Sequence, residues 1–162
     1  MSEFLYQTTW MRLDETGRDE IVAFWHHHGA LRDEAAARQR VDQVVGVARS
    51  GSEIAGVCTA MPIRVPDLGH DLYYYRTFVA PPYRGGMILL RLLKRAVAVL
   101  EAHSRARPET TPGGVYLELE NPAFGRRFRR AAWHRPGLEF IYIGRTSRGL
   151  ERRVKWFRHT VA

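Results

Sequence analysis

The sequence contains a single cysteine, Cys58, and no uninterrupted apolar stretch long enough to span a lipid bilayer. One cysteine excludes an internal disulfide framework and is typical of a protein that works in a reducing cytoplasm. No charged-then-apolar leader opens the chain. We therefore expect a cytoplasmic protein that has no membrane partner.

Acidic residues are scarce beside basic ones, with 17 Asp and Glu against 25 Lys and Arg and a net charge of +8. A basic surface attracts anions, which include a phosphorylated cofactor, an acidic protein and nucleic acid. The net charge alone does not distinguish among these classes of partner. The length fits one domain, residues 1–162, that can bury a substantial core, and the sequence has no internal repeat or domain boundary.

The most informative stretch lies in the middle of the chain. Residues Tyr73–Val79 are aromatic and β-branched, which predicts a strand, and Met87–Leu100 are leucine-rich with one charged stripe, which predicts a helix. Between them, two prolines end the strand, and Gly85 and Gly86 leave the first helical amides without side-chain cover. These amides carry partial positive charge, so a phosphate can bind there beside Arg84. The alternative is a turn that needs glycine only for its geometry.

The other predicted elements surround this centre in a simple order. They are a strand at Phe4–Leu13, a helix from Thr16 to a stop at Gly29, a short helix at Arg32–Asp42, a hairpin of Val44–Ala48 and Ile54–Met61, a loop through Pro62, a flexible connection at His103–Gly114, a strand at Val115–Glu120, a basic helix from Asn121 through Trp133, and closing strands at Leu138–Thr146 and Arg153–Thr160.

Three adjacent histidines, His26 to His28, end the first predicted helix. Adjacent residues on a helix point in different directions, so the three cannot converge on one ion, and we expect no metal site. A solvated helix end and a substrate contact are the two interpretations of this triplet.

The run Val79-Ala80-Pro81-Pro82-Tyr83-Arg84-Gly85 resembles the Val-x-Pro-x-Tyr-Arg-Gly run of the GNAT superfamily of N-acetyltransferases, where it joins the fourth strand to the third helix. Glu53–Gly56 resembles a turn of that family, and Asn121 stands where the family often has asparagine before its fourth helix. The resemblance implies an α/β (α+β) fold. Its mixed, mostly antiparallel sheet would have six to seven strands, flanked by about four helices, with strands four and five splayed apart.

The resemblance also implies that acetyl-coenzyme A, or another acyl-coenzyme A, enters between the splayed strands. The backbone of Phe78 and Val79 would pair with the pantetheine arm, and Asn121 would be a further cofactor contact. The pyrophosphate would be held by the amides of Arg84, Gly85, Gly86, Met87, Ile88 and Leu89. Met87 and Leu89 stand where the family pattern has small residues, so either the two glycines before them provide the close approach or these side chains crowd the pyrophosphate.

Acyl transfer to an amine needs a carboxylate or histidine to deprotonate the ammonium and an acid to protonate the leaving thiolate. Phe128 stands where the family often has a tyrosine acid, and phenylalanine has no proton to donate. The candidate catalytic residues are Glu118 and Glu120 on strand five, and Tyr73 and Tyr75 on strand four. A solvated strand edge is the alternative for the glutamates, and core or pocket lining is the alternative for the tyrosines.

These observations predict an N-acyltransferase that moves an acetyl or related acyl group from acyl-coenzyme A to a primary amine of a small molecule or protein. One alternative takes its acyl chain from an acidic acyl carrier protein, and another is a non-catalytic binding module with the same fold. The four arginines at 126, 127, 129 and 130 fit a solvated helix face, single-stranded nucleic acid, an acidic carrier or a coenzyme 3′-phosphate. The oligomeric state stays open, with a homodimer among the alternatives.

Overall fold

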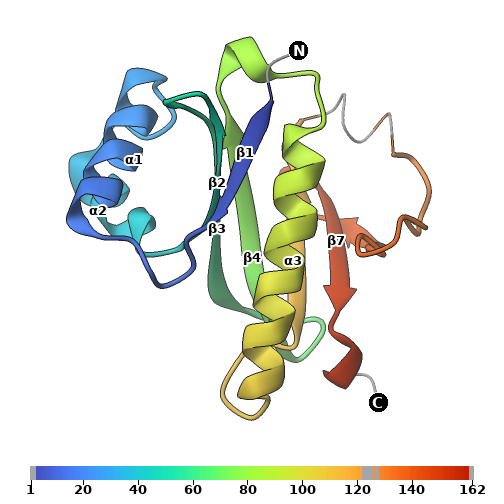
Figure 1. Ribbon diagram of the computed structural model, residues 1–162. Coiled ribbons are helices and arrows are strands. Elements are labelled where there is room, and N and C mark those ends of the chain that lie inside the picture. The colour runs from blue at the N-terminus through green and yellow to red at the C-terminus, as the bar shows by residue number, and fades with distance from the viewer. Residues whose placement is uncertain (1–2, 122–125, 127, 161–162) are drawn as a thin grey trace. The chain divides into compact units, whose positions relative to one another are not determined.

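The computed structural model describes residues 3–121, 126 and 128–160 (Figure 1). Seven strands form one mixed, mostly antiparallel sheet in the order β1-β2-β3-β4-β5-β7-β6, in which β4 and β5 run parallel. The elements are β1 (Phe4–Thr8), α1 (Glu15–His27), α2 (Glu34–Val41), β2 (Val44–Ser50), β3 (Glu53–Val65), β4 (His70–Val79), α3 (Ile88–Ala106), β5 (Gly114–Leu119), β6 (Ile141–Arg145) and β7 (Glu151–Trp156), with 3-10 turns at Pro81–Tyr83 and Arg158–Thr160. The predicted α/β class and mixed sheet are confirmed.

The chain forms two compact units. The first unit contains residues 1–60 and 76–99, and the second contains residues 61–75 and 100–162. The prediction of a single domain over residues 1–162 stays a prediction. Within the described residues, no helix combines the length and the apolar character that crossing a bilayer requires.

In the first unit, aspartates begin both short helices. The side chain of Asp14 accepts a hydrogen bond from the Gly17 amide at 2.8 Å, and Asp33 does the same for the Ala36 amide. Asp14 is therefore the N-cap of α1. The helix begins at Glu15, one residue before the predicted start at Thr16.

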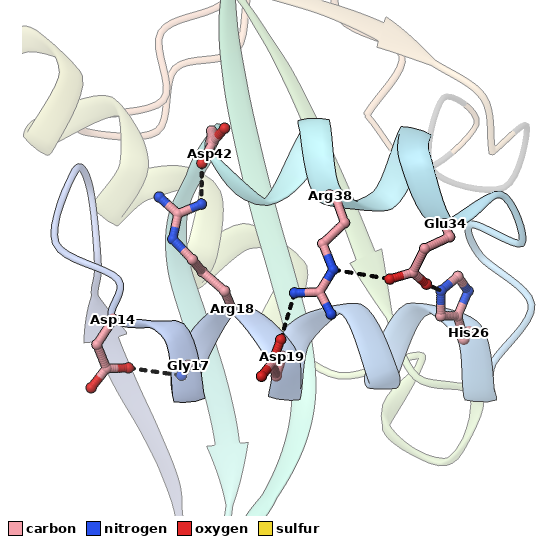
Figure 2. Close-up of polar contacts among 8 residues, drawn as sticks. All are labelled: Asp14, Gly17, Arg18, Asp19, His26, Glu34, Arg38 and Asp42. Carbon is pink, nitrogen blue, oxygen red and sulfur yellow. Dashed lines mark hydrogen bonds and ion pairs between the residues drawn. The ribbon is translucent and has the colours of Figure 1, made fainter.

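Polar contacts join α1 to α2 (Figure 2). Arg38 pairs with both Asp19 and Glu34, and Arg18 pairs with Asp42, which follows α2. Because these pairs are solvent-exposed, water and salt screen them and they contribute little to stability. The apolar face of α1 contributes more: it buries Ile21, Val22, Phe24 and Trp25 in a core with Ala37, Val41, Val44, Val47, Ile54, Val57 and Ala80.

Two glycines on neighbouring strands of the first unit face α3. Val47 and Val57 belong to the core beneath α1 and α2, and because strand residues alternate, Gly46 and Gly56 face the other way. A Cβ at Gly56 would lie 3.2 Å from Leu92, 3.4 Å from Ile88 and 3.3 Å from the Phe78 carbonyl oxygen. Glycine therefore allows the start of α3 to lie close against the sheet.

The second unit is built on β5. This strand pairs in parallel with β4 through Tyr73↔Val115 and Tyr74↔Tyr116, and antiparallel with β7 over its whole length. One cluster of buried residues in the second unit consists of Val65, Leu72, Tyr116 and Val154. A Cβ at Gly114 would lie 2.4 Å from the Lys155 carbonyl oxygen, so this position requires glycine for the close approach to β7.

Several predicted boundaries are wrong. The first strand ends at Thr8, and Met11, which lies within the predicted strand Phe4–Leu13, has a φ of 58° in a turn. The third strand continues to Val65, through the expected loop at Pro62. The helix α3 runs on to Ala106, because Ser104 is buried and its hydroxyl donates to the Pro112 carbonyl at 2.8 Å.

The helix predicted from Asn121 through Trp133 lies partly outside the described residues, at 122–125 and 127. For the described second half, the prediction of a helix is wrong, because residues 128–133 are not helical. Ala132 instead forms a β-bridge with Ile141, and the Trp133 amide donates to the Phe140 carbonyl at 2.9 Å. The closing hairpin is confirmed, with β6 and β7 shorter than predicted.

Candidate functional site

The turn between β4 and α3 leaves a row of backbone N–H groups uncovered. The Arg84 amide donates to the Pro81 carbonyl at 3.3 Å, and the Arg91 amide donates to the Met87 carbonyl at 2.9 Å. Between these two, among the described residues, the amides of residues 85–90 have no backbone acceptor. Since the dipole of α3 adds partial positive charge at the same place, this turn can bind an anion.

The side chains of this turn leave space above these amides. Gly85 has a φ of +88°, and a Cβ added at Gly85 or Gly86 would meet nothing within 4 Å. Met87 is 43% exposed, whereas Ile88 is buried and anchors the helix start. The open side of the turn is therefore formed by the two glycines.

The arginine of the turn folds back onto β4. Its Nε donates to the Val79 carbonyl at 2.9 Å, and its guanidinium lies 5.3 Å from the centre of the Phe78 ring. The Ala80 amide donates to the Ala55 carbonyl on β3 at 2.8 Å. Because backbone groups alternate in direction along a strand, the polar groups of Val79 point away from β3. Arg84 therefore covers the carbonyl on that edge of β4.

The three histidines at the end of α1 have different surroundings. The His26 Nε2 lies 2.7 Å from a Glu34 carboxylate oxygen, and this hydrogen bond is the main reason that its pKa is raised (Figure 2). His27 is exposed. His28 is half-buried, with its ring centre 4.9 Å from that of Phe24 and 6.0 Å from that of Phe78. Burial is the main reason that the pKa of His28 is lowered, and His27 and Arg84 lower it further.

In the second unit, Glu118 accepts hydrogen bonds from two tyrosines. The Tyr116 hydroxyl lies 2.9 Å from one carboxylate oxygen, and the Tyr74 hydroxyl lies 3.3 Å from the other. Arg152 Nε donates to the Tyr116 hydroxyl at 3.0 Å and pairs with Asp67 at 2.8 Å. Burial is the main reason that the pKa of Tyr116 is raised, so its hydroxyl stays a donor to Glu118. The network holds Glu118 in one orientation.

The other candidate catalytic residues lie apart from this network. Tyr73 and Tyr75 are buried, and since neighbouring strand residues alternate, they face away from the side of Tyr74 and Glu118. Burial raises the pKa of Tyr73 to about 12. Glu120 is exposed beyond the end of β5.

Tyr74 was not among the sequence candidates. Its contact with Glu118 follows from the pairing Tyr74↔Tyr116, which joins residues far apart in the chain. Asn121, predicted as a cofactor contact, is exposed after β5.

The basic cluster is only partly described, because Arg127 lies outside the described residues. Arg126, Arg129 and Arg130 are exposed, whereas Trp133 is 6% exposed and packs under the buried guanidinium of Arg153. Trp133 therefore has no free face for stacking on a base.

Comparison with solved structures identifies the fold. The structure superposes on an acetyltransferase of the GNAT family from Streptococcus pneumoniae with a TM-score of 0.63 and 14% identity, over 96% of this chain and 99% of that one. The ribosomal-protein-S18-alanine N-acetyltransferase from Escherichia coli gives a TM-score of 0.53 at 15% identity, over 94% and 90% of the two chains. The chain has the GNAT fold.

A third GNAT-fold match is NAA60 of Arabidopsis thaliana, in complex with acetyl-CoA, with a TM-score of 0.57 and 16% identity over 95% of this chain and 99% of that one. No family model and no curated protein matches the sequence. The resemblance predicted from the run Val79–Gly85 is therefore confirmed for the GNAT fold, at 14–16% identity to these structures.

Proposed function

We propose that the protein is an N-acyltransferase that transfers an acyl group from acyl-coenzyme A to a primary amine. The observation that carries this proposal is the row of uncovered amides at residues 85–90 beside the open face of Gly85 and Gly86. The acetyl-CoA complex among the similar structures supports the donor, and the alanine N-acetyltransferase among them supports an amine acceptor, small or protein-bound.

The donor would bind along the first unit. The amides from Arg84 to Leu89 would hold the pyrophosphate, with hydrogen bonds strengthened by the dipole of α3. Of the two predicted residues, Val79 has its backbone groups on the edge away from β3 and would pair with the pantetheine arm, whereas the Phe78 carbonyl faces β3 beside Gly56. Since Arg84 already donates to the Val79 carbonyl, the arm would bind the Val79 N–H or displace that guanidinium. Asn121 stays a predicted further contact.

Among the candidate catalytic residues, we propose Glu118 for the acceptor. Its carboxylate accepts hydrogen bonds from two tyrosyl hydroxyls, which fix its orientation. An ionised carboxylate held in one orientation binds and orients an ammonium group.

A second candidate function keeps the fold and takes the acyl chain from an acidic carrier protein, which the exposed Arg126, Arg129 and Arg130 favour. A binding module without catalysis is the third, favoured by Phe128 in place of an acid. We further propose a cytoplasmic location, since a chain with one cysteine forms no internal disulfide.

Thermal unfolding with acetyl-CoA tests the donor. A ligand at about 100 times its Kd stabilises the folded state by about 2.7 kcal/mol, which raises the Tm by about 5–10 °C for a chain of this size. Adenosine, which lacks the diphosphate, serves as the control and should leave the Tm unchanged. If acetyl-, longer acyl- and free coenzyme A all fail to shift the Tm, the protein does not use a coenzyme A donor.

Release of free thiol on addition of primary amines then separates an enzyme from a binding module. The panel comprises alkylamines, amino acids and peptides with a free amino terminus. Thiol release only from an acyl carrier protein would favour the second candidate function, and saturable coenzyme binding without thiol release would favour the third.

Replacing Glu118 by glutamine tests the acceptor contact. Glutamine keeps the shape and loses the charge, so KM for the amine should rise about 10- to 100-fold, the loss expected for one charge-assisted hydrogen bond. KM for acetyl-CoA should change little. Glu109→Gln, at an exposed loop position, is the control, and Glu120→Gln decides between the two carboxylates of the strand. An unchanged KM for the amine in Glu118→Gln would exclude this contact.

A further inference from the structure

The histidine triplet has one member whose position differs from the other two. His26 contacts the Glu34 carboxylate at 2.7 Å (Figure 2). It also contacts the Leu31 carbonyl at 2.7 Å, and His27 is exposed. His28 is packed between Phe24 and Phe78, at the end of α1. The triplet therefore brings a single imidazole to Phe78 on β4, next to Val79, whose backbone is proposed to hold the pantetheine arm.

The surroundings of His28 lower its pKa and so favour the neutral imidazole. His27 lies beside it on its own helix, with ring centres 4.8 Å apart, and Arg84 faces it from the turn after β4. Phe24 and Phe78, which pack against its ring, are apolar. Burial is the main cause that lowers the pKa of His28, and His27 and Arg84 lower it further, so the imidazole can accept a proton at pH 7.

We propose that His28 is the general base of the acyl transfer, which takes the proton from the acceptor ammonium. This assignment rests on the proposed function, because it needs the acyl donor to lie along Phe78. It gives a role to one member of a triplet that the sequence leaves as a solvated helix end or a substrate contact, because the contact with Phe78 joins residues fifty positions apart.

The proton balance is simple. His28 takes one proton from R–NH3⁺, and the resulting amine nitrogen bonds to the thioester carbon. The carbon–sulfur bond then breaks, and the second excess proton on nitrogen goes to the leaving sulfur. The products are the N-acyl amine and the free thiol of coenzyme A, and His28 returns its proton to water.

Variants of His28 and His27 test this role. His28→Gln should lower kcat for a primary alkylamine by about 10²–10⁴-fold, the usual contribution of a general base. Its rate with hydroxylamine, whose nitrogen is largely unprotonated at pH 7.5, should stay within about threefold of the unmodified protein, because no base is needed. The matched variant His27→Gln should keep both rates. Equal loss with both nucleophiles, or no loss with either, would overturn the assignment.

The pH profile gives an independent readout. For the unmodified protein, kcat/KM should fall on the acid side with a midpoint below 6.5, the ordinary value for histidine, because protonated His28 cannot act as base. This limb should be absent in His28→Gln. A limb that persists unchanged in the variant would assign the base to another group.

Binding can be separated from catalysis by NMR of histidine labelled with carbon-13 at Cε1. Acetyl-CoA should shift the His28 resonance, identified by its absence in His28→Gln, more than that of His26. A rise in Tm with acetyl-CoA and an unmoved His28 resonance would overturn this role and leave the proposed function standing. If acetyl-CoA neither raises the Tm nor shifts any resonance, the proposed function fails and the assignment fails with it.

Discussion

Replacing Arg153 by alanine is expected to lower the free energy of unfolding by about 3–5 kcal/mol, the usual loss when one partner of a buried charged group is removed. The side chain is 1% exposed, and its guanidinium donates to the carbonyls of Phe128 and Ala131 at 3.3 Å each. It also lies 4.6 Å from the centre of the Trp133 ring. Alanine would remove these two bonds and the ion pair with Glu151, in which the charged atoms lie 3.3 Å apart, and would open a cavity beside the indole. The two carbonyls would keep one donor each, the Trp133 indole and the Tyr142 amide.

A lysine at the same position separates charge from shape. Lysine keeps the positive charge but lacks the planar fork that reaches both carbonyls and covers the indole, so Arg153→Lys should lose about 1–3 kcal/mol. Arg148→Ala, in the exposed turn between β6 and β7, should stay within about 0.5 kcal/mol of the unmodified protein.

Urea unfolding followed by tryptophan fluorescence measures these changes, and amide hydrogen exchange in β7 reports the loss locally. Equal urea midpoints for the Arg153→Ala and Arg148→Ala variants would show that the buried arginine does not hold residues 128–133 to β7.

The second large effect is expected at Gly85. An aspartate there would place a negative charge beside the amides proposed to hold the pyrophosphate. Two unit charges 4 Å apart repel by about 1 kcal/mol in bulk water and by about 4 kcal/mol at an effective dielectric constant near 20. The Kd for acetyl-CoA should therefore rise about 5- to 1,000-fold, with the larger effect at low salt because salt screens exposed charges.

Two further variants isolate the charge effect. Gly85→Asn has nearly the shape of the aspartate variant and tolerates the positive φ of this position, so it should bind acetyl-CoA more tightly than Gly85→Asp. Gly149→Asp introduces the same residue at a turn with a φ of +81° and nothing within 4 Å, and it should leave the Kd unchanged. Equal Kd values for Gly85→Asp and Gly85→Asn, by calorimetry, would mean that no phosphate lies at this turn.

Helices, strands and turns that depend on short stretches of the chain could be predicted from the sequence. The alternation of Val115–Glu120, the leucine-rich run from Met87 and the turn residues of the β2–β3 hairpin are local patterns, and each is confirmed as an element. Boundaries were less predictable where a long-range contact sets them. The hydrogen bond from Ser104 to Pro112, for example, lies where the sequence indicates a flexible loop.

The side-chain contacts were the hardest to predict. Tyr74 meets Glu118 only because of the register between β4 and β5, and His28 meets Phe78 only because α1 packs on the sheet. Arg153 is buried although arginine is among the residue types most often exposed, so its type gives the opposite expectation. Each of these contacts joins residues far apart in the chain, which local periodicity does not report.

Gly46 and Gly56 have a consequence for how this protein can change over generations. A Cβ at Gly56 would lie within 3.4 Å of Leu92 and Ile88, so an added side chain there would press against the start of α3. At Gly46 the nearest atom would be the Gln7 carbonyl oxygen on β1, at 3.3 Å. Mutational drift is therefore expected to be restricted at these two strand positions as well as at Gly85, where the proposed phosphate contact restricts it.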